Sequence, residues 1–187
     1  MPPNKKYTKE EIVNIAYKIV ESEGFENLNA RRIAKELNAS VQPIFHNFTS
    51  MEELKNTVYE KIYETYQNYM ERVTEKHAYK QSGLSYIEFA KDHPVLFKIL
   101  FMKETNNSPE NFIINDSEGE DITKKGQQLT GLSYEDQKKF HVKVFIFTHG
   151  IACLLATKTV KLEESEIEEL LTNTVLELLK GYKEERL

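Results

Sequence analysis

The sequence predicts an all-α protein, with an N-terminal three-helix helix-turn-helix domain over residues 1–50 and a C-terminal helical domain over residues 51–187. Apolar residues recur at the three- and four-residue spacing of a buried helix face. No stretch alternates apolar and polar residues as a half-buried strand does. Seven glycines and five prolines among 187 residues leave room for long helices.

Composition and charge fit a soluble globular protein, with 40% apolar and 29% charged residues. A single cysteine, Cys153, excludes an intramolecular disulfide, so a cytoplasmic location is expected. The apolar stretch from Val142 to Ala156 is interrupted by His149 and Gly150 and is too short to span a bilayer, so a buried helix is expected there. The net charge is −5, but residues 1–50 hold seven Lys or Arg against six Asp or Glu. Any contact with DNA is therefore expected in this first segment.

The first helix is predicted to begin after Thr8. Glu11 follows three residues later and completes a capping box, in which each residue binds the backbone amide of the other. Gly24 is predicted to end the helix, because glycine tolerates the left-handed conformation. The residues expected on its buried face are Ile12, Ile15, Ala16, Ile19 and Val20.

Two further short helices are predicted in the first domain. One begins near Asn29, and a tight turn at Asn38 follows it. Ser40 is expected to cap the next helix, residues 41–47, in which Pro43 occupies the first turn at no cost in hydrogen bonds. Two short helices joined by such a turn have helix-turn-helix geometry. A short helix with a polar outer side fits the major groove of DNA.

The second domain is predicted to consist of longer helices. Ser50 and Glu53 form a second capping box, which opens a helix to about residue 76. The other helices are expected over residues 81–92, 94–102, 133–157 and 163–182. The polar segment 104–131 is expected to be loop-rich, with one helix over residues 122–129.

A more specific signal lies in the order of residues between positions 24 and 54. The string is Gly24-Phe25, Arg31-Arg32-Ile33-Ala34-Lys35-Glu36-Leu37, Ser40, Ile44-Phe45-His46-Asn47-Phe48 and Glu52-Glu53-Leu54. With this string, residues 8–55 resemble the DNA-binding domain of the TetR family. The chain departs from the family pattern at Val41, Gln42-Pro43, Phe45, Asn47 and Met51, where the family often has a basic or hydroxyl-bearing residue. These departures put the affinity for DNA in question and leave the fold unaffected.

The resemblance implies that the first domain binds double-stranded DNA. Gln42 is the expected base-reading residue, because its amide can make two bonds to adenine. Phe45 is expected either in the core or on the DNA. Lys5 and Lys6 are candidates for an arm that reaches DNA. The full set of expected DNA contacts is Asn29, Arg31, Ser40, Gln42, Phe45, His46, Asn47, Thr49 and Lys55.

The second domain is also similar to a known type. Residues 84–102, which contain Phe-Ala and His-Pro-Val-Leu-Phe, and the later Thr148-His149-Gly150 are similar to a C-terminal domain found in TetR relatives. This similarity implies ligand binding and dimerisation, with the last two helices forming the homodimer interface. The expected effector is a small apolar or aromatic molecule. Its expected lining residues are Tyr86, Phe89, Phe97, Phe101, Phe112, Phe147 and His149.

The function expected from these patterns is a ligand-responsive repressor that binds a pseudo-palindromic operator as a homodimer. No cofactor or metal is expected, since His149 and Cys153 are too few ligands for a metal site. No nucleophile–base string or phosphate-binding loop indicates an enzyme. The alternative is a protein-interaction module that has kept the TetR fold and lost DNA binding.

Overall fold

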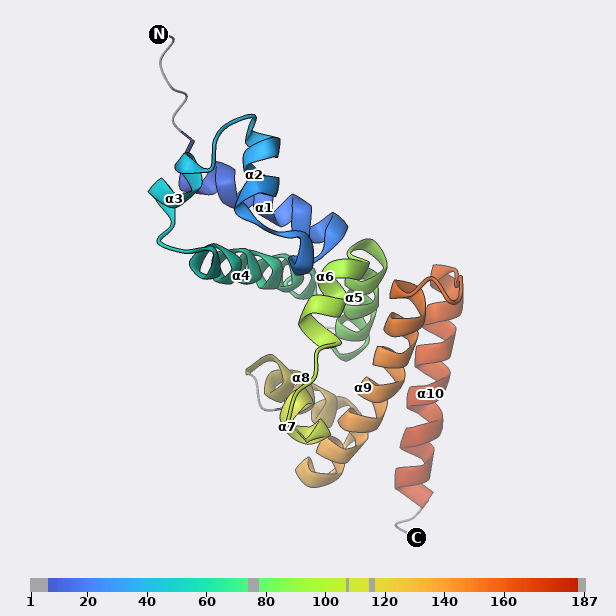
Figure 1. The fold of residues 1–187 in the computed structure, drawn as a ribbon. Helices are drawn as coiled ribbons and strands as arrows, with labels where there is room; N and C mark the ends of the chain where they lie inside the picture. Colours follow the sequence, from blue (N-terminus) through green and yellow to red (C-terminus); the bar gives the residue numbers. More distant parts are fainter. Residues whose placement is uncertain (1–6, 74–77, 107, 115–116, 185–187) are drawn as a thin grey trace. The chain divides into compact units, whose positions relative to one another are not determined.

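A computed structural model describes residues 7–73, 78–106, 108–114 and 117–184, and these residues form helices and no strand. The all-α prediction is confirmed (Figure 1). The helices are α1 (Lys9–Glu23), α2 (Ala30–Leu37), α3 (Gln42–Asn47), α4 (Met51–Met70), α5 (Ala78–Asp92), α6 (Pro94–Phe101), α7 (Pro109–Ile114), α8 (Ser117–Thr130), α9 (Tyr134–Ala156) and α10 (Glu164–Glu184), with a 3-10 turn at Phe25–Asn27.

The chain forms two compact units, which are described separately. Unit 1 comprises Met1–Gln67 and Val95–Met102, and unit 2 comprises Asn68–Pro94 and Lys103–Leu187. Unit 1 thus holds most of α4 and nearly all of α6 in addition to the first three helices. The expected division at residue 50 concerns the functional domains and stays a prediction.

The capping box of α1 has both of its predicted hydrogen bonds. The Glu11 backbone amide donates to Thr8 Oγ1 at 3.1 Å, and the Thr8 backbone amide donates to the Glu11 carboxylate at 2.8 Å. Gly24 ends the helix with φ at 82°, a conformation that L residues rarely adopt. One expected core position differs, because Val13 is buried and Ile15 is half-buried.

The helix-turn-helix is formed by α2 and α3. Asn29 caps α2 by accepting the Arg32 amide, and Asn38 closes the turn in the left-handed conformation, with φ 51° and ψ 46°. The expected start of the next helix was wrong by one residue: α3 begins at Gln42, and Val41 is its N-cap. Ser40 makes no cap at this boundary, although its Oγ accepts the Gln42 amide at 3.3 Å.

Unit 1 is completed by α4, which contributes a buried apolar row of Leu54, Val58 and Ile62. The Lys9 ammonium lies 3.2 Å from the Glu53 carboxylate, and Tyr17 Oη lies 3.2 Å from Thr65 Oγ1. Since residue numbers rise together in both pairs, α1 and α4 run in the same direction. α4 ends at Met70, earlier than expected, and residues 74–77 lie outside the described part of the chain.

Unit 2 is built around α9, which contacts α5, α7, α8 and α10. Figure 1 shows α9 and α10 side by side. Part of the core consists of buried Leu132, Phe140 and Val144, with Leu178 and Tyr182 of α10 packed against them.

In the segment 104–131, the helix expected over residues 122–129 lies within α8, but α8 begins earlier and α7 is an additional helix, so the segment is less loop-rich than expected. Ion pairs between Lys124 and Glu120 and between Lys125 and Asp121, each four residues apart, support α8 despite its polar composition.

The helix α9 is both long and apolar. By length and composition, its 23 residues are sufficient to cross a membrane, which corrects the expectation that the apolar stretch is too short. The core helix of a soluble protein meets the same criteria, and 44% of the most apolar window of α9 is buried inside the structure.

Candidate DNA-binding interface and effector-binding region

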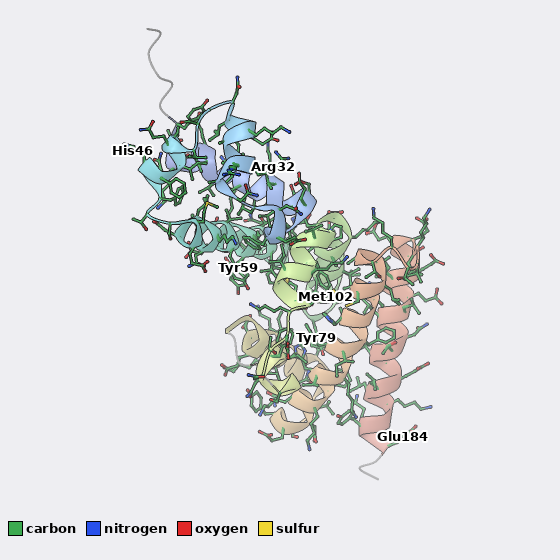
Figure 2. The ribbon with its side chains drawn as sticks, in the orientation of Figure 1. Arg32, His46, Tyr59, Tyr79, Met102 and Glu184 are labelled. Atoms are coloured by element: carbon green, nitrogen blue, oxygen red, sulfur yellow. The ribbon has the colours of Figure 1, made fainter. Side chains whose placement is uncertain are left out.

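The outer face of α3 is formed by four exposed side chains, Val41, Gln42, Phe45 and His46. Successive residues of a helix are about 100° apart, so these four positions form one continuous face. Figure 2 places His46 on α3 at the outer edge of unit 1. The opposite face buries Ile44, which is 0% exposed.

This arrangement decides between the two expectations for Phe45. Phe45 is 51% exposed, whereas Phe48 at the end of the helix is 2% exposed and supplies the aromatic core contact. Phe45 is therefore not a core residue, and its ring is available to a partner.

The two neighbouring arginines of α2 have different surroundings. Arg32 donates to the Glu23 carboxylate at 2.7 Å and also to the Glu36 carboxylate, and the two carboxylates raise its pKa. Figure 2 labels Arg32 within unit 1. Arg31 is exposed and has no ion pair among the described residues. Arg31 is therefore the arginine that can bind a phosphate without breaking an internal contact.

The side chains of Asn29 and Ser40 form hydrogen bonds with backbone groups of the helix-turn-helix segment. Asn29 Oδ1 accepts the Arg32 amide at 3.0 Å, and its Nδ2 donates to the Asn27 carbonyl at 3.3 Å. Ser40 Oγ accepts the Gln42 amide, which leaves the hydroxyl hydrogen to donate. Both residues thus position the motif, and Ser40 keeps a donor for a ligand.

Asn47 ties α3 to the residues before α1. Its side-chain amide donates to the Tyr7 carbonyl at 3.2 Å and to the Pro43 carbonyl at 2.8 Å. An amide has two N–H donors, so both are engaged. The expected DNA contact of Asn47 stays a prediction, and its carbonyl oxygen would have to make it.

Thr49 is bound to Glu53 rather than open to a phosphate. The Thr49 backbone amide and hydroxyl each donate to Glu53 Oε2 at 2.7 Å, and with Lys9 they lower the pKa of Glu53 to about 2. The expected capping box between Ser50 and Glu53 is therefore half correct. Ser50 Oγ accepts the Glu53 amide at 3.1 Å, but the Glu53 carboxylate binds Thr49.

The remaining basic candidates are less defined. Lys55 is half-buried on α4, and Lys5 and Lys6 lie outside the described residues.

In unit 2, Tyr86, His149 and Phe112 of the expected effector site gather around Phe145. The Tyr86 hydroxyl lies 2.8 Å from His149 Nδ1, and His149 Nε2 lies 3.3 Å from Cys153 Sγ. The rings of Phe145 and His149 are stacked at 14°, and the Phe112 ring lies edge-on to Phe145. Burial lowers the pKa of His149 and raises that of Cys153, so both stay uncharged near neutral pH.

Sequence reasoning missed Phe145, although it lies four residues before His149 on the same helix face. The other expected lining residues do not join this group. Phe89 is fully buried against Tyr69 and His93, Phe147 is half-buried on α9, and Phe97 and Phe101 belong to unit 1.

A hollow of about 320 Å³ lies between α9 and α10. None of the expected effector residues lines it; the lining residues are Lys143, Thr174, Glu177, Leu178, Gly181 and Tyr182. In the described residues, no group of three or more His, Cys, Asp or Glu is arranged to hold a metal ion.

A second polar group in unit 2 is more deeply buried. The Tyr79 hydroxyl lies 3.2 Å from His141 Nδ1, and burial lowers the pKa of His141 to about 4. Gln137 is fully buried; its Oε1 accepts the Thr130 hydroxyl at 2.6 Å, and its Nε2 has no hydrogen-bond partner. Gly126 packs against this amide so closely that a Cβ there would lie 2.5 Å from Gln137 Nε2.

Comparisons with known proteins give a family match for the N-terminal region and structural similarity for nearly the whole chain. Residues 12–58, which include the helix-turn-helix, match the family model of bacterial regulatory proteins, tetR family. No curated protein sequence matches the chain significantly.

Solved structures are similar over nearly the whole chain. A TetR-like transcriptional regulator from Rhodococcus sp. RHA1 is 12% identical, with a TM-score of 0.67 over 95% of this chain and 98% of that chain. A protein of unknown function from the same organism is 17% identical, with a TM-score of 0.67 over 97% and 98%. A TetR variant from Acinetobacter baumannii AYE in complex with minocycline is 12% identical, with a TM-score of 0.52 over 97% and 99%.

At these identities the solved structures show the fold, and the family model adds the assignment of the N-terminal domain. By that match, residues 12–58 are similar to the N-terminal domain of bacterial regulatory proteins of the tetR family, which supports a role in transcriptional regulation.

Proposed function

We propose that the protein is a ligand-responsive repressor that binds a pseudo-palindromic DNA operator as a homodimer. The exposed outer face of α3, with Arg31 on the preceding helix, is the observation that carries the proposal. A helix with its side chains fits the major groove, and Gln42 can bind adenine through two hydrogen bonds.

Phosphate contacts would be few in this protein. Thr49, Asn47 and Arg32 have donors engaged within the chain, which leaves Arg31, Lys55 and Ser40 as donors for the backbone of DNA. Each phosphate neutralised by a cation adds to the dependence of affinity on salt. We therefore expect a shallow salt dependence and a large share of the affinity from base contacts.

The proposed homodimer interface is an apolar stripe on α9, formed by Ile146, Gly150 and Leu154. Ile146 is 57% exposed and Leu154 is 42% exposed, and they lie on the face of α9 opposite its buried residues. A Cβ at Gly150 would meet no atom within 4 Å. A second copy of α9 could therefore approach closely there, in a helix bundle.

The proposed effector is a small apolar or aromatic molecule that unit 2 binds near Tyr86, Phe112, Phe145 and His149. Aromatic rings would supply the contact area, and the hydroxyl and imidazole would orient the ligand. The similar TetR structure from A. baumannii is a complex with minocycline. Minocycline and other aromatic drugs are therefore the first compounds to test for release of the protein from DNA.

The test of the proposal is a gel shift with the DNA upstream of the protein's own gene. We expect sequence-preferring binding with a shallow salt dependence, which Gln42→Ala and Arg31→Ala each weaken by roughly tenfold or more. Lys18→Ala, which removes an exposed cation from α1, is the matched control and leaves binding unchanged. Absence of any preference for sequence contradicts the proposal.

A second candidate function is a protein-interaction module that no longer binds DNA. It is favoured by the internal engagement of Thr49 and Asn47 and by the apolar character of Val41 and Phe45 on the outer face of α3. The same gel shift separates the two functions, since the module would dimerise and bind no operator.

A further inference from the structure

The outer face of α3 contains two apolar side chains that the fold does not need. Within the described part of the first fifty residues, Val41 and Phe45 are the exposed large hydrophobic side chains, at 36% and 51%. They are four residues apart, and side chains at that spacing are neighbours on a helix surface. Ile44 and Phe48 already fill the core beneath them.

Gln42 and His46 lie beside this pair on the same exposed face. The face therefore has an apolar half, Val41 with Phe45, and a polar half, Gln42 with His46. Among the described residues, none of these four side chains makes a hydrogen bond or an ion pair. The face is therefore not committed to an internal contact.

In the major groove, thymine is the base that presents an apolar group, its C5 methyl. We infer that Val41 and Phe45 read thymine methyl groups next to an adenine bound by Gln42, so that each operator half-site has an A·T-rich centre. The inference rests on the proposed function and adds which base chemistry the reading helix prefers. Apolar contact also explains how a helix without a basic side chain at positions 41 and 45 gains affinity.

The experiment starts with selection of preferred duplexes by the full-length protein from a random library. Each thymine of one selected half-site is then replaced by uracil, which removes the methyl group alone. The affinity of each duplex is measured by fluorescence anisotropy for the wild type and for Val41→Ala and Phe45→Ala. Circular dichroism melting confirms that the variants are folded, as expected for exposed positions.

We expect uracil at one or two half-site positions to weaken wild-type binding about fourfold for each methyl lost. Phe45→Ala weakens binding to the thymine duplex by roughly tenfold and no longer distinguishes thymine from uracil at its position. Met102→Ala removes another exposed apolar side chain of unit 1, away from α3, and keeps the full methyl dependence (Figure 2).

Two results overturn the inference while the proposed function stands. One is sequence-preferring binding that tolerates uracil at every position. The other is a methyl dependence that Val41→Ala and Phe45→Ala leave unchanged. If Phe45→Ala has no effect on DNA affinity, the apolar pair faces another partner, such as a protein. If the protein selects no sequence at all, the proposed function fails and the inference with it.

Discussion

Two adjacent arginines of α2, Arg31 and Arg32, have the same side chain but different surroundings, so one is suited to binding DNA and the other to stabilising the fold. Arg32 lies within reach of Glu23 and Glu36 and holds α2 to the end of α1, whereas Arg31 is turned to solvent. A guanidinium paired with two carboxylates would have to break these pairs to bind a phosphate.

We therefore expect Arg32→Ala to lower the Tm of the protein and Arg31→Ala to leave it unchanged. Arg31→Ala should lower the affinity for DNA even where the variant is fully folded. Arg32→Ala should leave the affinity for DNA unchanged at a temperature where that variant is fully folded. Thermal melts and anisotropy titrations of both variants check this. An Arg31→Ala variant with a lower Tm and normal DNA affinity contradicts the assignment.

The buried His141 makes stability depend on pH. Its pKa is about 4 in the folded chain because burial disfavours the charged ring, compared with 6.5 for an unperturbed histidine. Between these values the unfolded state binds more protons than the folded state, so stability falls as pH decreases from about 6.5 towards 4. Linkage gives a loss of about 2 kcal/mol between about pH 7 and pH 5.

Urea unfolding at the two pH values measures this loss. His141→Gln should remove most of it, and His149, whose pKa burial also lowers, should account for a remainder. His46→Gln, a change at an exposed histidine of α3, should leave the loss intact. An equal pH dependence in the His141→Gln variant and the wild type contradicts the explanation.

At the scale of elements, close packing of α8 against α5 and α9 depends on one glycine. A Cβ at Gly126 would lie 2.5 Å from Gln137 Nε2 and 2.8 Å from the Tyr79 ring; Gln137 is fully buried and Tyr79 is half-buried. Added atoms in a well-packed core force neighbours out of their preferred rotamers.

Gly126→Ala is expected to destabilise the protein by roughly 1–3 kcal/mol through overpacking. Gly181→Ala is the matched control, because a Cβ there meets nothing within 4 Å and alanine favours a helix by up to about 1 kcal/mol. Denaturant unfolding of both variants tests the pair. Equal effects at the two glycines contradict the packing described for Gly126.

Elements with strong local signals were predictable from the sequence, and those that depend on tertiary contacts were not. Thr8 with Glu11, Asn29 and Ser133 each cap the helix that follows them, because a cap is a contact between close neighbours in sequence. The start of α3 and the partner of the Glu53 carboxylate were each misjudged by one residue. Ser40 Oγ accepts the Gln42 amide ahead of the helix, and Thr49 rather than Ser50 donates its backbone amide to Glu53.

α7 and the length of α8 were missed for a different reason. Their sequence is polar and weakly periodic, and their helices depend on ion pairs along α8 and on packing against α9. In the candidate sites, the sequence indicated the segment that is proposed to face DNA. The sequence predicted Arg31, and not Arg32, as a DNA contact, but it could not show that Glu23 and Glu36 engage Arg32 or that Phe145 lies beside His149, because these contacts depend on tertiary structure.

At the scale of the whole molecule, the proposed binding of a pseudo-palindromic operator requires two copies of α3, the helix proposed to read the bases. The apolar stripe of Ile146, Gly150 and Leu154 would otherwise expose two large hydrophobic side chains to water on α9. Exposed apolar patches of this kind mark sites of association.

Leu154→Glu is expected to convert the proposed dimer to a monomer of 21.9 kDa, because it places a charge within an apolar interface. Leu129→Glu introduces the same change at an exposed leucine of α8 and should leave the dimer intact. Sedimentation equilibrium distinguishes the two masses. A wild-type monomer, or a Leu154→Glu dimer, contradicts the proposed interface.

The most direct test of paired reading helices is the dependence of affinity on the distance between the two half-sites. In a dimer, the helices meet successive major grooves about one turn of DNA (~34 Å) apart. Insertion of about five base pairs between the half-sites moves one of them to the opposite side of the duplex. The account predicts that this insertion lowers affinity to that for a single half-site, and an unchanged affinity contradicts it.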